Sequence, residues 1–480
     1  MPQFATGDTM NTTRKEHDFI GELEINNDVY YGIQTFRALE NFNITGQRLC
    51  DYPTFVVALA QVKKAAALAN HELGLLDSRL KDAIVKACDR IIAGEFHDQF
   101  VVDMIQGGAG TSTNMNANEV IANVALEILG HKKGEYQYCH PNDHINLSQS
   151  TNDAYPTALR VALYERLNML SESMALLEES FRRKGKEFEN VLKMGRTQLQ
   201  DAVPMTLGQE FNAFASMVRI DIERILDARN LIRVINLGGT AIGTGINSHP
   251  DYRKIVEQKL QEVTNHPFIT ASDLIEATQG TGGYVQISGV LKRVSVKLSK
   301  ICNDLRLLSS GPRAGLNEIN LPKMQPGSSI MPGKVNPVIP EVVNQVCFSV
   351  IGNDMTITMA AEGGQLQLNV FEPVIAFGLF NSMKTLSRAI ETLVHKCIDG
   401  ITANEQVCKD FVFNSIGIVT ALNPYIGYEN SASIAKEALQ TGKPVYDIAL
   451  ERKLLQKEEL DKIFSLENML NPHMYKKTKH

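Results

Sequence analysis

The chain has 480 residues, of which 44% are apolar and 21% charged, and its formal net charge is −6. This balance is ordinary for a folded globular protein of about two to four domains, and it excludes a disordered or low-complexity chain. A protein that binds nucleic acid by neutralising phosphates is expected to be basic at least regionally, but the only basic block is the short run Lys476-Lys477-Thr478-Lys479.

The seven cysteines are scattered and include no CxxC pair, which argues against a disulfide framework and against a thiolate zinc site. The first residues have neither the basic region nor the apolar stretch of a signal peptide. No run of about 18 apolar residues occurs, since the best candidate, near residue 60, is broken by Lys63-Lys64. We therefore expect a cytoplasmic protein that binds neither membrane nor nucleic acid.

The first third of the chain is predicted to be mostly helical, with few strand signals, the clearest at residues 29–33. Apolar spacing predicts a helix over residues 55–73 and another over 118–129. Between them, a helix is expected to begin with Ser78 as N-cap and to end at Gly94. Residues 1–148 are interpreted as an N-terminal, mostly helical domain.

The middle of the chain carries much longer apolar stripes. Residues 156–192 contain one glycine, Gly185, and leucine and phenylalanine recur there at steps of three, four or seven. Helices of this length must bury their apolar faces against each other, within one chain or between chains, which predicts a long bundle shared by several subunits over residues 149–402. The alternative is several shorter helices broken at Gly185 or elsewhere. Similar stripes follow at residues 204–235, 283–308, 340–361 and 371–398.

After about residue 402 the helical pattern shortens, which predicts a small C-terminal helical domain over residues 403–480. Short helices are expected at residues 433–440, 445–452 and 458–464. The predicted fold is therefore mainly α, in three domains.

Four stretches of small polar residues interrupt the helical pattern. Each alone could be a turn or a helix cap, because Ser, Thr, Asn and Gly favour both. Together they offer hydroxyls, amides, backbone N–H groups and one or two cations with few carboxylates, which suits a small anion bearing several oxygens. The stretches are GGAGTSTNMN at 107–116, SQSTND at 148–153, GRTQLQD at 195–201 and GSSIMPGKVNP at 327–337.

Three other patterns are weaker indications of a site. Gly327 to Lys334 is not a P-loop, because five residues separate Gly327 from Gly333 and Val335 replaces the hydroxyl residue that would hold magnesium. The glycine-rich stretch at 238–245 lacks the strand–turn–helix setting of a dinucleotide site and is predicted to be a loop. His140 and His144 have the spacing of a metal pair, but the sequence HPNDH indicates a turn, so no metal site is predicted.

The stretch at 327–337 matches every fixed position of GSSxMPxKxNP, the signature of the aspartase/fumarase superfamily. The other three stretches match regions of that superfamily in the same order, so the chain resembles it over roughly residues 18–464. Within the superfamily, the segments at 150–153, 195–198 and 338–347 are more similar to aspartases than to class II fumarases.

This resemblance implies a mainly α, three-domain subunit whose central helices form the twenty-helix core of a homotetramer, with each active site built by three subunits. It implies reversible removal of ammonia from L-aspartate to give fumarate. The alternatives are class II fumarase activity on L-malate, or a non-catalytic scaffold protein like the crystallins of this superfamily. The resemblance implies no required cofactor, and it leaves open activation by a divalent cation, which some aspartases show.

By the same resemblance, Ser328 is the general base that removes the Cβ proton, and the resulting carbanion is held as an aci-carboxylate. Serine is a poor base unless its oxyanion is stabilised, which backbone N–H groups and Lys334 would do. Gln198 stands where some aspartases and the fumarases have His, and glutamine is no acid near neutrality, so no side chain is expected to protonate the leaving ammonia. The implied contacts are Thr111, Ser150, Thr151 and Ser329 to the β-carboxylate, Lys334 and Asn336 to the α-carboxylate, and Asn152, Thr197 and Gln198 near the amino group.

Overall fold

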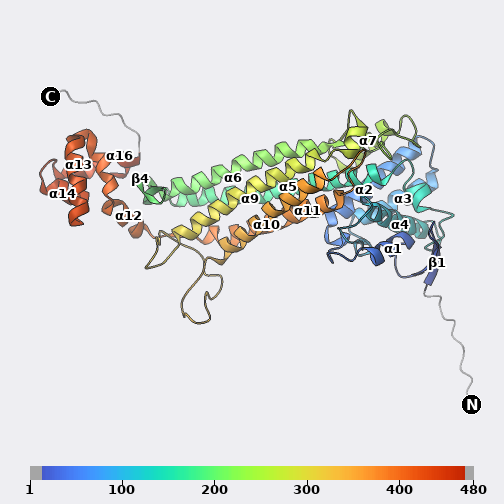
Figure 1. Cartoon of the computed structure of the whole chain (residues 1–480), viewed down its shortest axis with the longest axis horizontal. Helices are drawn as coiled ribbons and strands as arrows, with labels where there is room; N and C mark the ends of the chain where they lie inside the picture. Colours follow the sequence, from blue (N-terminus) through green and yellow to red (C-terminus); the bar gives the residue numbers. More distant parts are fainter. Residues whose placement is uncertain (1–12, 471–480) are drawn as a thin grey trace, which may run out of the picture. The chain divides into compact units, whose positions relative to one another are not determined.

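The computed structural model describes residues 13–470, so the basic run at 476–479 lies outside the described residues. This part of the chain is mainly helical, with several two-stranded sheets (Figure 1). The helices are α1 (Ile33–Asn41), α2 (Pro53–Glu72), α3 (Ser78–Ile92), α4 (Thr111–Ile128), α5 (Thr151–Glu187), α6 (Leu207–Arg229), α7 (Tyr252–Thr264), α8 (Leu274–Gln279), α9 (Gly282–Leu308), α10 (Val338–Glu362), α11 (Glu372–Lys396), α12 (Glu405–Asn414), α13 (Asn423–Thr441), α14 (Val445–Glu451), α15 (Lys457–Ile463) and α16 (Leu466–Leu470).

The strands are short and pair two by two. One pair is parallel, β5 with β6, and the others are antiparallel. The strands are β1 (Thr13–His17) with β2 (Glu22–Asn26), β3 (Leu192–Thr197) with β4 (Gln200–Thr206), β5 (Val234–Ile235) with β6 (Ile269–Thr270), and β7 (Ile319–Asn320) with β8 (Thr402–Ala403).

Internal contacts divide the chain into two compact units. Unit 1 consists of Met1–Ser171, Glu223–Ser295 and Phe348–Leu386, and unit 2 consists of Glu172–Ile222, Val296–Cys347 and Ser387–His480. The division into domains at 1–148, 149–402 and 403–480 stays a prediction. Among residues 13–470, no helix has the length and apolar character needed to cross a membrane.

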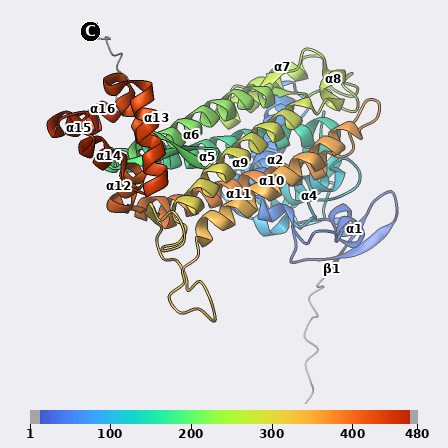
Figure 2. The same cartoon turned by 60° about the vertical axis from the view of Figure 1, so that its left-hand side comes forward.

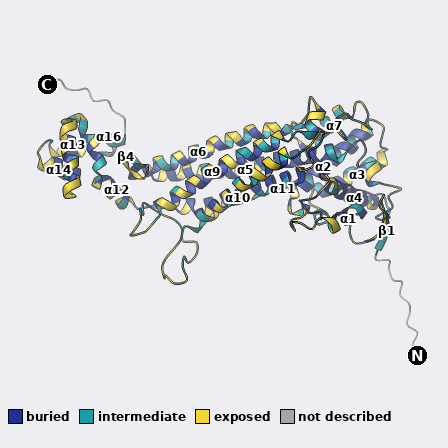
Figure 3. Cartoon of the chain, in the orientation of Figure 1, coloured by how far each residue is buried: buried dark blue, intermediate teal, exposed yellow. Residues whose placement is uncertain are grey.

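Helix α2 lies at the centre of the core of unit 1, in contact with α3, α4 and α7. The apolar residues that predicted this helix, including Phe55, Leu59 and Val62, are fully buried, and most of α2 has the colour of buried residues in Figure 3. The next helix, α3, is capped by Asp77, whose carboxylate accepts the N–H of Leu80 at 3.0 Å. The predicted N-cap, Ser78, is therefore wrong by one residue.

The strand predicted at residues 29–33 is wrong. Ile33 begins α1, and the strands of this region, β1 and β2, form an earlier hairpin. The sequence of β1, TRKEH, has no apolar residue and so gives no strand signal, whereas ELEIN in β2 alternates polar and apolar residues, a strand signal that was missed.

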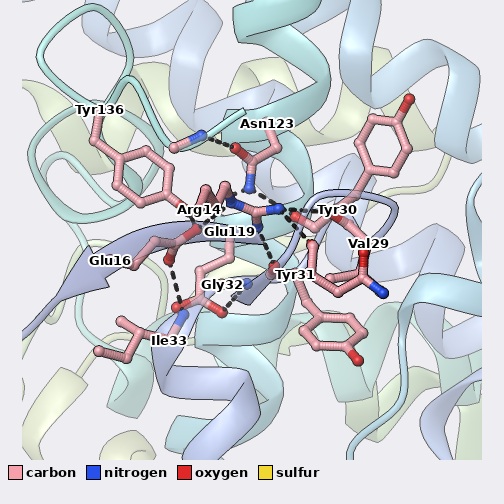
Figure 4. A network of polar contacts seen from close by, with 12 residues as sticks. Arg14, Glu16, Val29, Tyr30, Tyr31, Gly32, Ile33, Glu119, Asn123 and Tyr136 are labelled. Carbon is pink, nitrogen blue, oxygen red and sulfur yellow. Dashed lines mark hydrogen bonds and ion pairs between the residues drawn. The ribbon is translucent and has the colours of Figure 1, made fainter. Parts of the chain in front are cut away.

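Two buried carboxylates explain why a helix begins at Ile33. Glu119 accepts the N–H of Gly32 at 2.9 Å, and Glu16 accepts the N–H of Ile33 at 2.8 Å. Negative charge at a helix N-terminus is stabilising, because it satisfies free N–H groups and opposes the helix dipole. Figure 4 shows both carboxylates beneath Arg14, which pairs with Glu16 at 2.7 Å. These partners are distant in sequence from the helix they start.

The long helices α5, α6, α9, α10 and α11 confirm the helices that the apolar stripes predicted. Each of them contributes residues to both units. Helix α5 continues through Gly185 to Glu187, so the alternative of a break at Gly185 is wrong. A Cβ at Gly185 would lie 2.6 Å from the side chain of Asn212 in α6. The glycine therefore permits close packing of two helices and does not end one.

Polar contacts fix the long helices within each unit. In unit 1, Asp354 of α10 accepts hydrogen bonds from Ser288 and Lys292 of α9, at 2.8 and 2.6 Å. In unit 2, Lys297 of α9 pairs with Asp221 of α6 at 2.9 Å. The two views agree that these helices run side by side within each unit (Figures 1 and 2).

The C-terminal helices have an apolar core of their own inside unit 2, formed with residues of β3. Helices α14 and α15 confirm the predictions at 445–452 and 458–464. The helix predicted at 433–440 is the second part of α13, which is interrupted at Gly427 (φ 78°). The buried core residues include Met194, Val412, Leu422, Ile434, Ile448 and Leu460.

Candidate active site

The first polar segment forms the start of α4, seven residues before the helix predicted at 118–129. Thr111 is the first helical residue, and its hydroxyl donates to the carbonyl of Gly108 at 2.7 Å. The preceding Gly110 has φ 89°, and a Cβ there would lie 2.4 Å from the ring of Tyr155. Only glycine combines this backbone conformation with so close an approach of α4 to α5.

The second polar segment caps the start of α5. The N–H of Ser150 donates to Asp153 Oδ1 at 2.8 Å, and Ser150 Oγ accepts the N–H of Asn152 at 3.2 Å. Asn114, one turn into α4, donates to Thr151 Oγ1 at 3.1 Å. The structure thus brings the first two segments together at the N-terminal ends of two helices, where free N–H groups and helix dipoles favour anions.

Ser150 and Thr151 line a cavity of 710 Å³ within unit 1. Another wall of this cavity is the glycine-rich stretch at 238–245, which is a loop, as predicted. This loop is attached to α5, because the side-chain N–H of Asn152 donates to the carbonyl of Ala241 at 2.7 Å. Asn152 was predicted to lie near the amino group of the substrate. In this structure its amide nitrogen already donates to the Ala241 carbonyl.

Asp153 is a fully buried carboxylate to which sequence reasoning gave no role. Its Oδ2 accepts the N–H groups of Gly238 and Thr240, each at 2.9 Å. Burial raises the pKa of Asp153 to about 6, although these backbone N–H groups act in the opposite direction. Asp153 thereby ties the glycine-rich loop to the helix that begins at Thr151.

Lys63 of α2 is a second functional candidate missed from the sequence. Its buried ammonium donates to the side-chain oxygens of Asn114, Asn146 and Gln149, at 2.7, 2.9 and 2.9 Å. Burial lowers its pKa to about 7, against the attraction of Asp153. Lys63 holds the amide that contacts Thr151, and its signal in the sequence was a lysine within an apolar helix face.

The two histidines of the HPNDH stretch lie in a single π-helical turn, Pro141–Ile145. The Nδ1 atom of His144 accepts the N–H of His140 at 2.8 Å, and the Nδ1 atom of His140 accepts the N–H of Asn142 at 3.1 Å. The imidazoles thus close their own turn, which agrees with the predicted turn.

The third polar segment is the tip of the β3–β4 hairpin, although apolar stripes had predicted helix as far as residue 192 and again from 204. Gln198 and Leu199 form the turn with φ 55° and 62°, the left-handed conformation of tight hairpin turns. The side chains of Thr197 and Gln198 are exposed there. No glycine marks this turn, which is why the hairpin was not recognised.

The fourth polar segment lies in the loop between β7 and α10, which we call the signature loop (residues 321–337). The N–H of Gly327 donates to the carbonyl of Lys334 at 2.8 Å, and the side chain of Asn336 donates to the carbonyl of Gly327 at 2.7 Å. A Cβ at Gly327 would lie 2.5 Å from the Lys334 carbonyl oxygen, so the closure requires glycine.

Ser328 is half-buried inside this closed loop. Its Oγ accepts two backbone N–H groups, from Ile330 at 3.2 Å and Met331 at 3.0 Å. Such donors stabilise a serine oxyanion more than a neutral hydroxyl, so they favour loss of the hydroxyl proton. Ser329 and Lys334 are exposed on the same loop.

The predicted site residues are divided between the units. Unit 1 contains Thr111, Ser150, Thr151 and Asn152, and Asn114 joins the helix that begins at Thr111 to Thr151. Unit 2 contains the hairpin tip and the signature loop, whose closure depends on its own hydrogen bonds. The individual roles of these residues stay predictions. The residues in unit 2 are Thr197, Gln198, Ser328, Ser329, Lys334 and Asn336.

Comparison with known proteins agrees with these motifs. A family model described as lyase matches residues 21–352, and one described as fumarase C C-terminus matches residues 418–471. An aspartate ammonia-lyase of Helicobacter pylori is 72% identical over 97% of this chain and 100% of its own length. This chain belongs to the aspartase/fumarase family of lyases.

Solved structures confirm the mainly α fold of the aspartase/fumarase family. The crystal structure of fumarate lyase:delta crystallin from Brucella melitensis bound to cobalt is 54% identical, with a TM-score of 0.92 over 94% of this chain and 98% of that one. A class II fumarase from Schistosoma mansoni is 36% identical, with a TM-score of 0.90 over 96% of this chain and 100% of that one. Identity to the ammonia-lyase is thus twice that to this fumarase.

Proposed function

We propose that this chain catalyses the reversible removal of ammonia from L-aspartate to give fumarate. The high identity to an aspartate ammonia-lyase supports this reaction over the alternatives. The structural observation that carries the proposal is the position of Ser328 Oγ between two backbone N–H donors, inside the signature loop. The oxyanion of a hydroxyl so placed is suited to act as the base that the reaction requires.

The chemical difficulty is the weak acidity of the Cβ proton next to a carboxylate. The Ser328 oxyanion takes this proton and becomes a neutral hydroxyl, and the electron pair of the C–H bond moves into the β-carboxylate, which becomes a doubly charged aci-carboxylate. Thr151 and Ser150, at the start of α5, supply donors for that charge, and Thr111, at the start of α4, does so once its hydroxyl leaves the carbonyl of Gly108. The Cα–N bond then breaks, and because the amine leaves already protonated, Gln198 need not act as an acid.

We further propose a homotetramer in which three subunits build each site. Helix α10 presents Phe348, Met355 and Met359 with exposed fractions of 60%, 65% and 59%. Their spacing of seven and four residues places them on one face of the helix. Large apolar side chains in one stripe favour burial against another chain, and such assembly would join segments that belong to separate units.

The proposed reaction requires no cofactor, because the charge of the intermediate is met by hydroxyls, backbone N–H groups and Lys334. A divalent cation is proposed at most as an activator. The proposed location is the cytoplasm.

The proposed reaction is tested by following the ultraviolet absorbance of fumarate with the purified protein. We expect fumarate to form from L-aspartate and not from L-malate, because identity to an aspartate ammonia-lyase is 72% and identity to a class II fumarase is 36%. Fumarate from L-malate alone would identify a fumarase instead. A folded protein inactive on both substrates would support the scaffold alternative.

A further inference from the structure

A buried cluster of charges lies at the base of the signature loop, within unit 2. The carboxylate of Glu318, which immediately precedes β7, is 0% exposed. It pairs with Arg196 at 2.7 Å and with Lys193 at 3.1 Å, both on β3. Lys193 also pairs with Glu210 of α6, whose side chain is 21% exposed.

The two strands joined by this cluster each lead directly into a site segment. Arg196 is followed by Thr197 and Gln198 at the hairpin tip, and β7 is followed by the signature loop with Ser328. The backbone of Glu318 is already fixed, since its carbonyl accepts the N–H of Asn404 at 2.9 Å. Its carboxylate makes separate contacts, to Arg196 and Lys193 of β3.

We propose that Glu318 is a positioning residue whose buried carboxylate holds the start of the signature loop to the strand that presents Thr197 and Gln198. This inference rests on the proposed function, because it concerns the placement of the proposed base, Ser328. It holds whether the two segments enter one site or two neighbouring sites of an assembly.

The energetics of buried charges support a positioning role. A buried ion pair adds little net stability compared with apolar side chains of similar volume, but it fixes geometry, and removal of one partner is costly. The signature loop is largely exposed and has only short β7 and the start of α10 as fixed ends. A displacement of about 1 Å at a reacting group can lower the rate by about 10²-fold.

The experiment compares Glu318→Gln with Glu210→Gln. Glu210 belongs to the same cluster and pairs with Lys193 of β3, but among the described residues it has no ion pair with Arg196 or with β7, so its replacement is the matched control. We expect Glu318→Gln to lower kcat about 10–100-fold with KM changed less than about threefold. Glu210→Gln should keep kcat within about threefold of the wild type.

A second readout separates positioning from loss of stability. With L-aspartate deuterated at Cβ, the isotope effect on kcat should rise in Glu318→Gln, because a misplaced base makes proton removal more rate-limiting. If Glu318→Gln does not fold, Arg196→Gln removes the other side of the 2.7 Å pair and should show the same rise.

The inference is overturned if the folded variant keeps wild-type kcat and isotope effect, or if kcat falls only in proportion to the unfolded fraction. An equal effect of Glu210→Gln would also overturn it. Failure of the proposed function is recognised separately, since a wild-type protein without activity on L-aspartate would show it without reference to Glu318. A fully active Ser328→Ala variant would show that another group is the base.

Discussion

Replacing Ser328 by alanine lowers kcat for L-aspartate about 10²–10⁴-fold, the contribution expected of a positioned general base. The hydroxyl oxygen lies between the N–H groups of Ile330 and Met331, which stabilise its anion. Alanine removes the oxygen and leaves these donors free for solvent, so the loop closure between Gly327 and Lys334 persists. Steady-state kinetics on the assembled protein measures the loss.

The control for this variant is Ser309→Ala, at a serine just beyond the end of α9 whose hydroxyl bonds only locally, to the carbonyl of Arg306 at 3.3 Å. It should keep wild-type kcat. A Ser328→Ala protein that assembles normally and turns over at the wild-type rate would show that another group removes the proton.

Replacing Lys334 by methionine lowers kcat/KM about 10²–10³-fold, mainly through a higher KM, because the α-carboxylate loses its cationic partner. Lys334 is exposed in the signature loop, so the free energy of unfolding should not change. Initial rates over a range of L-aspartate concentrations separate KM from kcat.

Lys323 provides the matched control, since it is an exposed lysine of the same loop outside the motif. Lys323→Met should have wild-type KM. Equal KM values for Lys334→Met and Lys323→Met would refute the assignment of Lys334 to the α-carboxylate.

The long helices could be predicted because their stability depends on a regular apolar face, which periodicity reports directly. Helix starts were harder to predict, because the groups that satisfy free N–H donors come from elsewhere in the chain. At α1 these groups are Glu119 and Glu16, far from Ile33 in sequence. At α3 the cap was the neighbouring Asp77 and not Ser78, a choice that propensity alone does not decide.

The site was predictable where its hydrogen bonds are local. The oxyanion donors of Ser328 lie two and three residues away, so the motif itself contains them. The residues that were missed act over long distances in sequence: Lys63 reaches Asn146, and Glu318 reaches Arg196. Nothing in the local pattern indicates such pairs, apart from a charged residue on an otherwise apolar face.

The proposed active site combines Thr151 of one subunit with Ser328 of another when subunits assemble. Its most direct test is a mixture of Ser328→Ala and Thr151→Val proteins, each with little activity alone, unfolded together and refolded as hybrids. If Thr151 and Ser328 of one site come from different subunits, random hybrids regain roughly a quarter of wild-type activity. If both residues of a site come from the same subunit, the mixture stays at the level of the separate variants, and that result would contradict the shared site.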